Sequence, residues 1–325
     1  MFEATSVPKT TNGDECFLGI VVPCFNEEEV LPETAQRLTA LLKGLIAEQR
    51  VTASSRVFFV DDGSNDSTWT LIEQLANNNP LIAGIKLSRN RGHQNALMAG
   101  LFTAEGDVLI SVDADLQDDI GIIPNMLSEH NRGIDLVYGV RKNRSSDSWF
   151  KRATAQGFYR LMNALGAESV YNHADFRLMS RRAIEALKQF REVNLFLRGM
   201  VPLVGFKSAI VYYERTERFA GVSKYPLRKM LSLALDAVTS FSVVPLRLIT
   251  LTGFIVFALS SIMVVYTLWV RLFTNQAIPG WTSTTLPIYF LGGIQILCLG
   301  VIGEYIGKVY QEVKNRPRYI IEKVI

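Results

Sequence analysis

Two long stretches near the C-terminal end of the chain carry no charged residue. One runs from Leu248 to Val270 and the other from Asn275 to Gly303. A helix that crosses the hydrocarbon core of a bilayer needs about 20 apolar residues, and core helices of soluble proteins seldom stay uncharged for so long. The pattern predicts two transmembrane helices over 247–310, with a buried helical hairpin as the alternative. It also makes the chain bipartite.

The lysines and arginines around these stretches lie on their outer flanks. The loop around Pro279 and Trp281 has none, and the flanking ones are Arg228, Lys229, Arg247, Lys308, Lys314, Arg316, Arg318 and Lys323. Because cytoplasmic loops carry the excess of Lys and Arg, we expect a multi-pass protein of the inner (cytoplasmic) membrane. Both termini, including a basic tail over 311–325, should then be cytoplasmic.

The segment 226–246 mixes charge with apolar residues. Arg228, Lys229 and Asp236 stand among leucines and Met230, which predicts an interfacial helix on the lipid bilayer. An ordinary amphipathic helix packed on the preceding domain is the alternative.

Overall charge and cysteine usage exclude several classes of protein. A formal net charge of +3 without a dense Lys/Arg block does not suit a nucleic-acid binder. Cys16, Cys24 and Cys298 have no Cys-x-x-Cys spacing, so neither a zinc site nor a disulfide framework is expected. The polar segment from Met1 to Phe17 lacks the apolar stretch of a secretory signal, and we expect the first domain in the cytosol.

Residues 1–225 alternate short β-branched runs with helical patterns. This alternation is typical of βα units around a mostly parallel sheet, so we expect an α/β, Rossmann-like fold. The expected strands are Leu18–Pro23, Arg56–Asp61, Ile82–Leu87, Asp107–Val112 and Leu136–Val140. The expected helices start after Pro32 and cover Ala96–Ala104 and Ser148–Leu165.

Two aspartates follow directly after one of the expected strands. Asp113 and Asp115 stand where ligand sites form in α/β proteins, at the carboxyl end of a strand. Their hard oxygen donors suit Mg²⁺ or Mn²⁺ bridging a diphosphate, and Gln117 could supply a third oxygen. A surface turn is the alternative for an isolated Asp-x-Asp.

Two other strand ends carry polar residues. Asp61 and Asp62 end one strand and can accept hydrogen bonds from a base or a ribose, although a capped βα turn would also explain them. Pro23 ends the first strand, and Asn26 and Glu27 follow at its mouth. We expect the three strand ends to converge on one site.

The chain resembles family 2 of the GT-A glycosyltransferases over nearly its whole length. The likeness rests on the motifs VVPCFNEEE, VDDGSNDST, LSRNRGHQNAL and DADLQD. It is closer to the polyprenyl-phosphate branch, with bactoprenol glucosyltransferase and dolichol-phosphate mannose synthase, through HADFRL, NLFLRG, RFAGVSKY and the glycine-rich tail around Gly303. The paired terminal spans favour the glucosyltransferase type.

The resemblance implies roles for particular residues. Pro23, Glu27 and Asp62 would hold the nucleoside, with Asn26 and Asp61 beside them, while Asp113, Asp115 and Gln117 would hold the metal. Asp175 would lie beside the reacting centre. Arg218 would clamp the diphosphate, together with Lys224 on the same motif. Arg141 with Lys151 or Arg152 would receive the lipid phosphate; Ala155 stands where some relatives carry a hydroxyl. Solvated surface charge near anionic lipid is the alternative for the basic residues.

The acceptor changes what the enzyme must do. A phosphate monoester is already anionic near neutral pH, because its second pKa is about 6. Asp175 should therefore orient the acceptor more than deprotonate it, while the metal and cationic side chains stabilise the departing diphosphate. His93 and His173 are interpreted as polar turn residues, and Glu304 as an interfacial cap or interhelix partner.

Three other functions fit the sequence less well. A processive polysaccharide synthase should carry a Gln-x-x-Arg-Trp pattern, which is missing, and a nucleotide-binding oxidoreductase needs Gly-x-Gly-x-x-Gly after its first strand. A non-catalytic membrane scaffold would not need Asp113, Asp115, Asp175 and Arg218. The expected reaction is inverting transfer of a hexose from a nucleotide-sugar donor, UDP-glucose first and N-acetylhexosamine or mannose donors next, onto polyprenyl phosphate. Glycines in the spans, such as Gly292 and Gly300, would permit a homo-oligomer.

Overall fold

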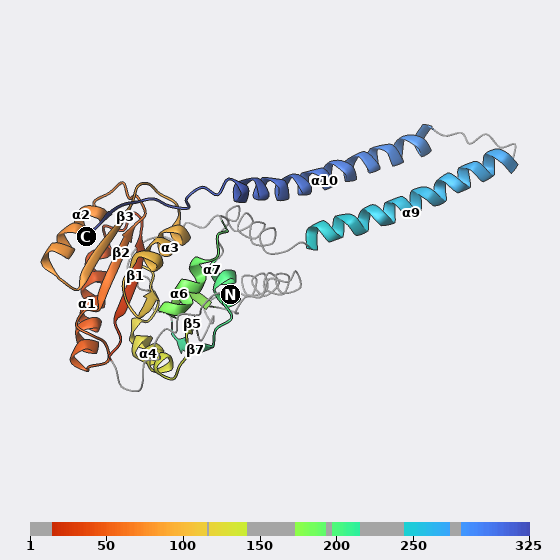
Figure 1. Cartoon of the computed structure of the whole chain (residues 1–325). Helices are drawn as coiled ribbons and strands as arrows, with labels where there is room; N and C mark the ends of the chain where they lie inside the picture. The colour runs from red at the N-terminus through yellow and green to blue at the C-terminus, as the bar shows by residue number, and fades with distance from the viewer. Residues whose placement is uncertain (1–14, 116, 142–172, 193–196, 215–243, 274–280) are drawn as a thin grey trace, which may run out of the picture. The chain divides into compact units, whose positions relative to one another are not determined.

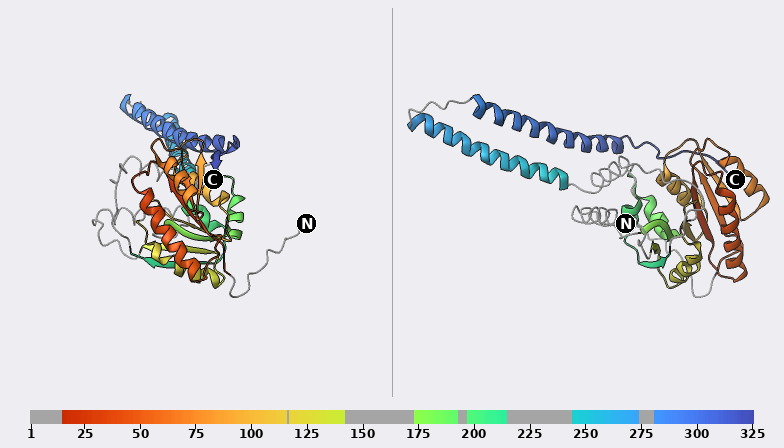
Figure 2. Two further views of the ribbon diagram at one scale, coloured as in Figure 1. Left: turned by 90° about the vertical axis from the view of Figure 1, so that its left-hand side faces the viewer. Right: turned by 180° about the vertical axis from the view of Figure 1, so that it is seen from behind.

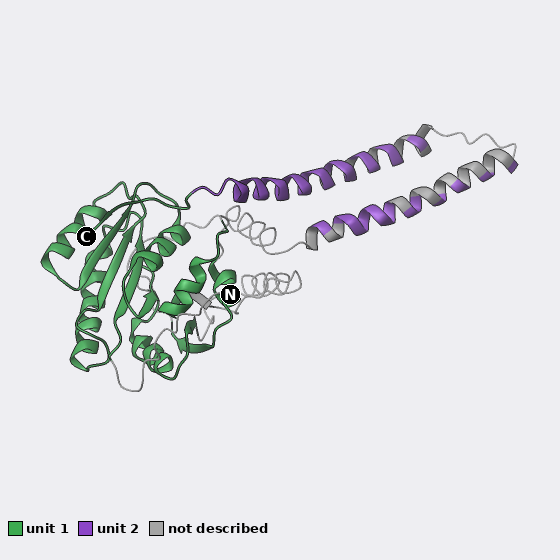
Figure 3. Ribbon diagram, in the orientation of Figure 1, with its two compact units in different colours: residues 1–155, 169–224, 317–325 green, residues 156–168, 225–316 purple. Residues whose placement is uncertain are grey.

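The computed structural model describes residues 15–115, 117–141, 173–192, 197–214, 244–273 and 281–325. The expected helix Ser148–Leu165 and the expected interfacial segment 226–246, up to residue 243, lie outside these ranges. The chain forms two compact units (Figure 3). Unit 1 holds 1–155, 169–224 and 317–325, and unit 2 holds 156–168 and 225–316.

Unit 1 is an α/β fold built on one sheet. Its described strands are β1 (Leu18–Cys24), β2 (Arg56–Asp61), β3 (Ile82–Leu87), β4 (Val108–Ser111), β5 (Leu136–Arg141), β6 (His173–Ser180), β7 (Ser208–Tyr213) and β8 (Ile321–Val324). They form one eight-stranded sheet in the order β7-β5-β6-β4-β1-β2-β3-β8. The pairs β4–β1, β1–β2, β2–β3 and β5–β7 are parallel. The expected α/β fold with a mostly parallel sheet is confirmed.

Helices cover both faces of this sheet (Figures 1 and 2). They are α1 (Leu31–Ala47), α2 (Thr68–Asn78), α3 (His93–Thr103), α4 (Ile123–Asn131), α6 (Arg181–Lys188) and α7 (Leu197–Leu203), with a 3₁₀ turn at Ile120–Ile122. Leu38 and Leu42 of α1 join the core cluster with Ile20 and Val22 of β1. Val21 points the other way, because successive strand residues alternate faces.

On that second face α3 lies very close to the sheet. A Cβ added at Gly100 of α3 would come within 2.3 Å of Val21 and 2.7 Å of Val60. Only glycine permits this approach. The close contact holds the second half of α3 directly against β1 and β2.

The sequence analysis did not predict β6, which lies inside the sheet, or β7, which forms one of its edges. β6 runs antiparallel between β4 and β5, and β7 pairs with the far side of β5. The sequence of β6, HADFRLMS, carries charge at Asp175 and Arg177, so it lacks the apolar run by which the other strands were recognised. Both charges are nevertheless buried.

The end of the chain forms an unexpected edge strand. β8 pairs antiparallel with β3, and beyond it Ile325 exchanges two backbone hydrogen bonds with Gly84, of 2.9 and 3.0 Å. Lys323 also binds Glu73 at 2.8 Å and Glu322 binds Lys86 at 2.9 Å. The segment 311–325, expected as a basic tail, therefore ends as part of the eight-stranded sheet.

Unit 2 contains two long helices, α9 (Val244–Phe273) and α10 (Trp281–Val313). α9 includes the uncharged stretch 248–270, and α10 includes most of 275–303. Within the described residues, however, no helix has both the length and the apolar character that a bilayer crossing requires. The two transmembrane helices predicted from the sequence are thus not supported by the structure.

The role of β8 can be tested by deletion. Removing residues 320–325 should lower the free energy of unfolding by about 3 kcal/mol, at about 1 kcal/mol net for each hydrogen bond of Ile325 to Gly84 and of Ser88 to Ile320. Urea denaturation of the purified protein in detergent measures this loss. Lys323→Ala, which keeps the backbone pairing and loses only an exposed ion pair, should leave the midpoint almost unchanged. A deletion variant as stable as the parent would contradict the role.

Candidate active site

Three neighbouring parallel strands bring the expected site residues to one edge of the sheet. β1 lies between β4 and β2, with Cys24 in register with Asp61 and Val21 with Ser111. The carboxyl ends of these strands therefore open onto the same edge, where α/β proteins bind ligands. Pro23 lies within β1, and the loops carrying Asn26, Asp62 and Asp113 all start from this edge.

The loops after β1 and β2 are hydrogen-bonded to each other. The backbone N–H of Asn26 donates to Ser64 Oγ at 3.0 Å, and that of Asn65 donates to Asn26 Oδ1 at 2.9 Å. The N–H of Glu27 donates to Thr68 Oγ1 at 2.9 Å. Asn26 has a φ of 54°, a left-handed conformation that asparagine tolerates. The expected nucleoside residues thus sit on a rigid pair of loops.

The two aspartates at the end of β2 differ in what they bind. Asp62 accepts from the backbone N–H of Arg91 at 2.7 Å and of Gly92 at 2.8 Å, at the start of α3. Asp61 is fully buried; its Oδ1 accepts from the N–H of Ser64, and its Oδ2 has no hydrogen-bond partner among the described residues. Burial raises the pKa of both carboxyls. Asp62 therefore joins the end of β2 to the start of α3, and Asp61 keeps one oxygen unpaired among the described residues.

Asp113, Asp115 and Gln117 follow β4 in one loop. Asp115 accepts from the backbone N–H of Gln117 at 3.3 Å. Burial raises the pKa of Asp113 to about 6, and the carboxylates of Asp175, Asp118 and Asp115 add to the effect against the opposing influence of His93. Such crowding of carboxylates favours a bound cation.

The residues in this loop suit one class of metal site. Across the described ranges, no group of three or more His, Cys, Asp or Glu side chains is arranged to hold a metal ion. Mg²⁺ commonly uses one or two carboxylates and takes its other ligands from substrate phosphates and water. Asp113 and Asp115 would fit a site of this kind, in which two carboxylates supply the protein ligands.

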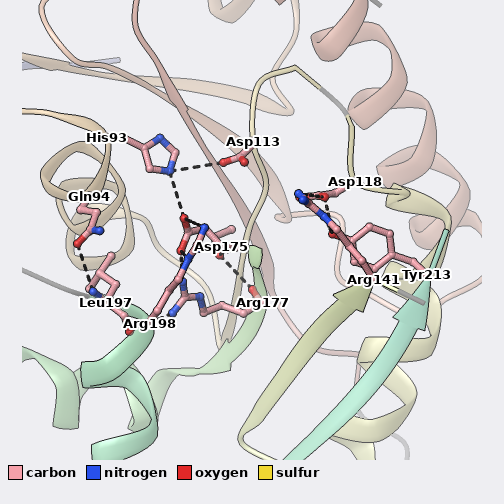
Figure 4. Close-up of polar contacts among 11 residues, drawn as sticks. His93, Gln94, Asp113, Asp118, Arg141, Asp175, Arg177, Leu197, Arg198 and Tyr213 are labelled. Carbon is pink, nitrogen blue, oxygen red and sulfur yellow. Dashed lines mark hydrogen bonds and ion pairs between the residues drawn. The ribbon is translucent and has the colours of Figure 1, made fainter. Parts of the chain in front are cut away.

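Asp175 is held by two arginines (Figure 4). Its carboxylate lies 2.5 Å from Arg177 Nη2 and 3.2 Å from Arg198 Nη2. Burial acts to raise the pKa of Asp175, but the two guanidinium groups outweigh it and hold this pKa well below its usual range. Asp175 therefore stays ionised at neutral pH and is a weak base.

His93 stands between the two groups of carboxylates. Its Nε2 lies 3.5 Å from Asp113 Oδ1 and 3.8 Å from Asp175 Oδ2 (Figure 4). The sequence analysis interpreted His93 as a polar turn residue, and the structure corrects this because His93 begins α3 directly above the strand ends. Its place in the LSRNRGHQNAL motif, just after a strand, was the signal available.

Arg177 and Arg198 were missed altogether. Arg177 is 1 % exposed, an unusual place for an arginine, and also donates to the carbonyl of Leu197 at 3.3 Å. Gln94 of α3 accepts from the backbone N–H of Leu197 at 3.2 Å, which ties α3 to α7. The motifs HADFRL and NLFLRG contained both arginines, but nothing in their spacing showed that they meet at Asp175.

The expected acceptor-phosphate residues are only partly described. Arg141 ends β5, and its guanidinium contacts Asp118 and Tyr213. Lys151 and Arg152 lie outside the described residues, as do Arg218 and Lys224, expected at the diphosphate. Their roles stay predictions.

Comparison with protein families shows to which family the chain belongs. The glycosyl transferase family 2 model matches residues 19–188, more than half of the chain. The chain belongs to glycosyl transferase family 2. Its fold is accordingly GT-A-like, and the protein is a glycosyltransferase. Residues 244–309 match a second model, the GtrB C-terminal hairpin.

Curated relatives of this family 2 glycosyltransferase match it along nearly all of their length. It is 52% identical to the uncharacterized glycosyltransferase YkoT of Bacillus subtilis, covering 94% of this chain and 91% of that protein. It is 41% identical to the SfII prophage-derived bactoprenol glucosyl transferase of Shigella flexneri, covering 94% and 97%. The prophage bactoprenol glucosyl transferase homolog of Escherichia coli K12 is also 41% identical, with 94% and 99% covered.

The ion pair at Asp175 makes a prediction about stability. Arg177→Met leaves a buried carboxylate short of its nearest cation, and removing one partner of a buried pair costs about 3–5 kcal/mol. Urea denaturation in detergent should show a loss of that size. Arg132→Met is the matched control, because Arg132 directly follows α4, is 73% exposed and pairs with Glu129 near the end of that helix. Equal stability of the Arg177 variant and the parent would refute the importance of the pair.

Proposed function

We propose that this glycosyltransferase transfers glucose from UDP-glucose to a polyprenyl phosphate at the cytoplasmic face of the membrane. The observation that carries the proposal is the similarity to bactoprenol glucosyl transferases, which extends over 94% of this chain. The similarity includes both unit 1 and the hairpin of α9 and α10, so these relatives share both parts of this chain. The product would be a lipid-phosphate-linked sugar for glycosylation of the cell envelope.

The donor side uses the loops at the strand ends. Pro23, Glu27 and Asp62 bind the nucleoside, with Asn26 and Asp61 beside them. Asp113 and Asp115, with Gln117, would hold Mg²⁺ or Mn²⁺. When bound, the metal ion stabilises charge on the diphosphate leaving group. Arg218 and Lys224 supply further positive charge to the same phosphates. The loop that carries Asp113, Asp115 and Gln117 after β4, here called the aspartate loop, thus places the leaving group at the carboxyl ends of the strands.

The acceptor side needs little help from a base. An oxygen of the lipid phosphate attacks the anomeric carbon, the bond from that carbon to the diphosphate oxygen breaks, and the nucleoside diphosphate leaves with the bonding electrons. The phosphate is already anionic, and Asp175 has a lowered pKa, so proton removal is not its task. Asp175 instead orients Arg177, Arg198 and His93 around the reacting centre. One direct displacement inverts the anomeric configuration.

The hairpin is proposed as the membrane anchor. Large apolar side chains along α9 and α10 are exposed, among them Phe254 at 70 %, Ile262 at 64 % and Leu299 at 67 %. Apolar surface of this extent is costly in water and suits a lipid environment. The match of 244–309 to a C-terminal hairpin and the flanking lysines and arginines support the same placement, with both termini in the cytoplasm.

A transfer assay tests the proposed reaction. With UDP-glucose and undecaprenyl phosphate in detergent, the enzyme should give a β-linked product, identified by NMR, and Asp115→Ala should lower the rate at least about 100-fold because a charged ligand of the leaving-group metal is lost. Asp119→Ala is the matched control, since Asp119 lies four residues on, is exposed and caps only a short turn. An α-linked product, transfer only from another nucleotide sugar, or full activity of Asp115→Ala would each contradict part of the proposal.

Thiol labelling tests the topology. Ser283 lies in the first turn of α10, directly after the loop that joins it to α9. A cysteine placed there should react with an impermeant reagent added outside cells, since this end of α10 is expected on the outer side of the cytoplasmic membrane. Cys16, Cys24 and Cys298 are replaced first, so that the label reports one site. A cysteine introduced at Asn315 is the control and should react only after the membrane is opened. The opposite pattern would reverse the proposed orientation.

A further inference from the structure

Arg141 belongs to a closed triangle of polar contacts with Asp118 and Tyr213, here called the Asp118 cluster (Figure 4). Asp118 Oδ1 accepts from Arg141 Nη2 at 3.1 Å and from the hydroxyl of Tyr213. Arg141 Nε donates to the same hydroxyl at 3.1 Å. The tyrosine hydroxyl thus donates and accepts at once, which a phenylalanine could not do.

Two members of the Asp118 cluster are buried and one is not. The side chain of Asp118 is 1% exposed and that of Arg141 is 29% exposed. The ring of Tyr213 is packed edge-on against Phe176 at 5.7 Å, and Gly139 leaves room for it. Asp118 and Tyr213 therefore form a fixed support, and Arg141 is the member that can reach a ligand.

The contacts with Asp118 and Tyr213 use only part of the guanidinium group of Arg141. Its hydrogen bonds within the described residues go through Nε and Nη2, and none of those bonds uses Nη1. An arginine can bind phosphate through the N–H groups that remain, and one already held in place loses less rotamer freedom when the phosphate arrives. The pKa of Tyr213 is raised by burial and by Asp118, so its hydroxyl keeps its proton.

The Asp118 cluster joins three segments of the active site. Asp118 ends the loop that carries Asp113 and Asp115, while Arg141 and Tyr213 end β5 and β7 and stand in register. In the sequence, β5 leads on to Lys151 and Arg152, and β7 leads on to Arg218. A displacement of Arg141 relative to the aspartate loop would change the distance between acceptor and donor.

We propose that Tyr213 and Asp118 are positioning residues that hold Arg141 in place for the phosphate of the acceptor and fix it relative to the aspartate loop. The inference rests on the proposed function, in which Arg141 binds that phosphate. Asp118 balances the charge of Arg141, and Tyr213 sets the direction of its guanidinium plane.

Tyr213→Phe is the direct test. The ring stays packed while the hydroxyl is lost, so KM for undecaprenyl phosphate should rise about tenfold, the effect of a hydrogen bond to a charged group. KM for UDP-glucose should change less than about twofold, because Asp118 keeps its contact with Arg141 and so holds the loop of Asp113 and Asp115 in place. Tyr212→Phe is the matched control: it lies on the same strand, is 59% exposed, and should leave both constants unchanged. Both are measured by product formation in mixed micelles.

A double-mutant cycle shows whether Tyr213 acts through Arg141. Arg141→Lys keeps the charge but loses the fork, so adding Tyr213→Phe to it should raise the acceptor KM little further. Three outcomes would overturn the inference while the wild type still transfers sugar. They are additive effects of the two substitutions on the acceptor KM, a rise in the donor KM instead, and unchanged kinetics of Tyr213→Phe. A wild type that transfers no sugar would overturn the proposed function and this inference with it.

Discussion

The antiparallel pairing of β6 with β4 is the constraint on which the active site depends. It sets Ser111 opposite Arg177, and the hydroxyl of Ser111 donates to the carbonyl of Asp175. Because Asp113 follows β4 and Asp175 lies at the facing end of β6, the two carboxylates come to the same place from positions far apart in the chain. Arg177 and Asp175 stand two residues apart on β6, and both are buried in the sheet that this pairing completes.

Charge balance then determines what each carboxylate can do. Asp175 is surrounded by cations and remains ionised, whereas Asp113 is crowded by other carboxylates and its pKa rises to about 6. A buried charge is tolerated only when it is paired, so Asp175 needs its cationic partners. The crowded carboxylates around Asp113 likewise favour a cation among them. Arginines supply the partner for Asp175, and a divalent cation with its diphosphate is the partner proposed for the aspartate loop.

The C-terminal strand gives the hairpin a second connection to the catalytic sheet. The chain leaves unit 1 before α9 and returns to it at Pro317, where β8 then pairs with β3. Arg318 also donates to the carbonyl of Phe190 at 2.6 Å. The hairpin is therefore joined to unit 1 through the chain at both of its ends, and β8 covers an edge of β3 that would otherwise expose unpaired backbone groups.

The sequence by itself determined the α/β class and the strands β1 to β5 within a residue or two. It also determined that Asp61 and Asp113 lie at the carboxyl ends of their strands. Apolar β-branched runs and the residues that end them are local signals, which is why these features could be predicted. The sequence also led to the correct family through its motifs. Only the tertiary structure decided that the charged segment His173–Ser180 is a buried strand and that Ile321–Val324 forms an edge strand beside β3. It also decided that His93, Arg177 and Arg198 surround Asp175. Those outcomes depend on pairing between segments distant in the chain, which buries and neutralises charges that look solvent-exposed when only local sequence is considered.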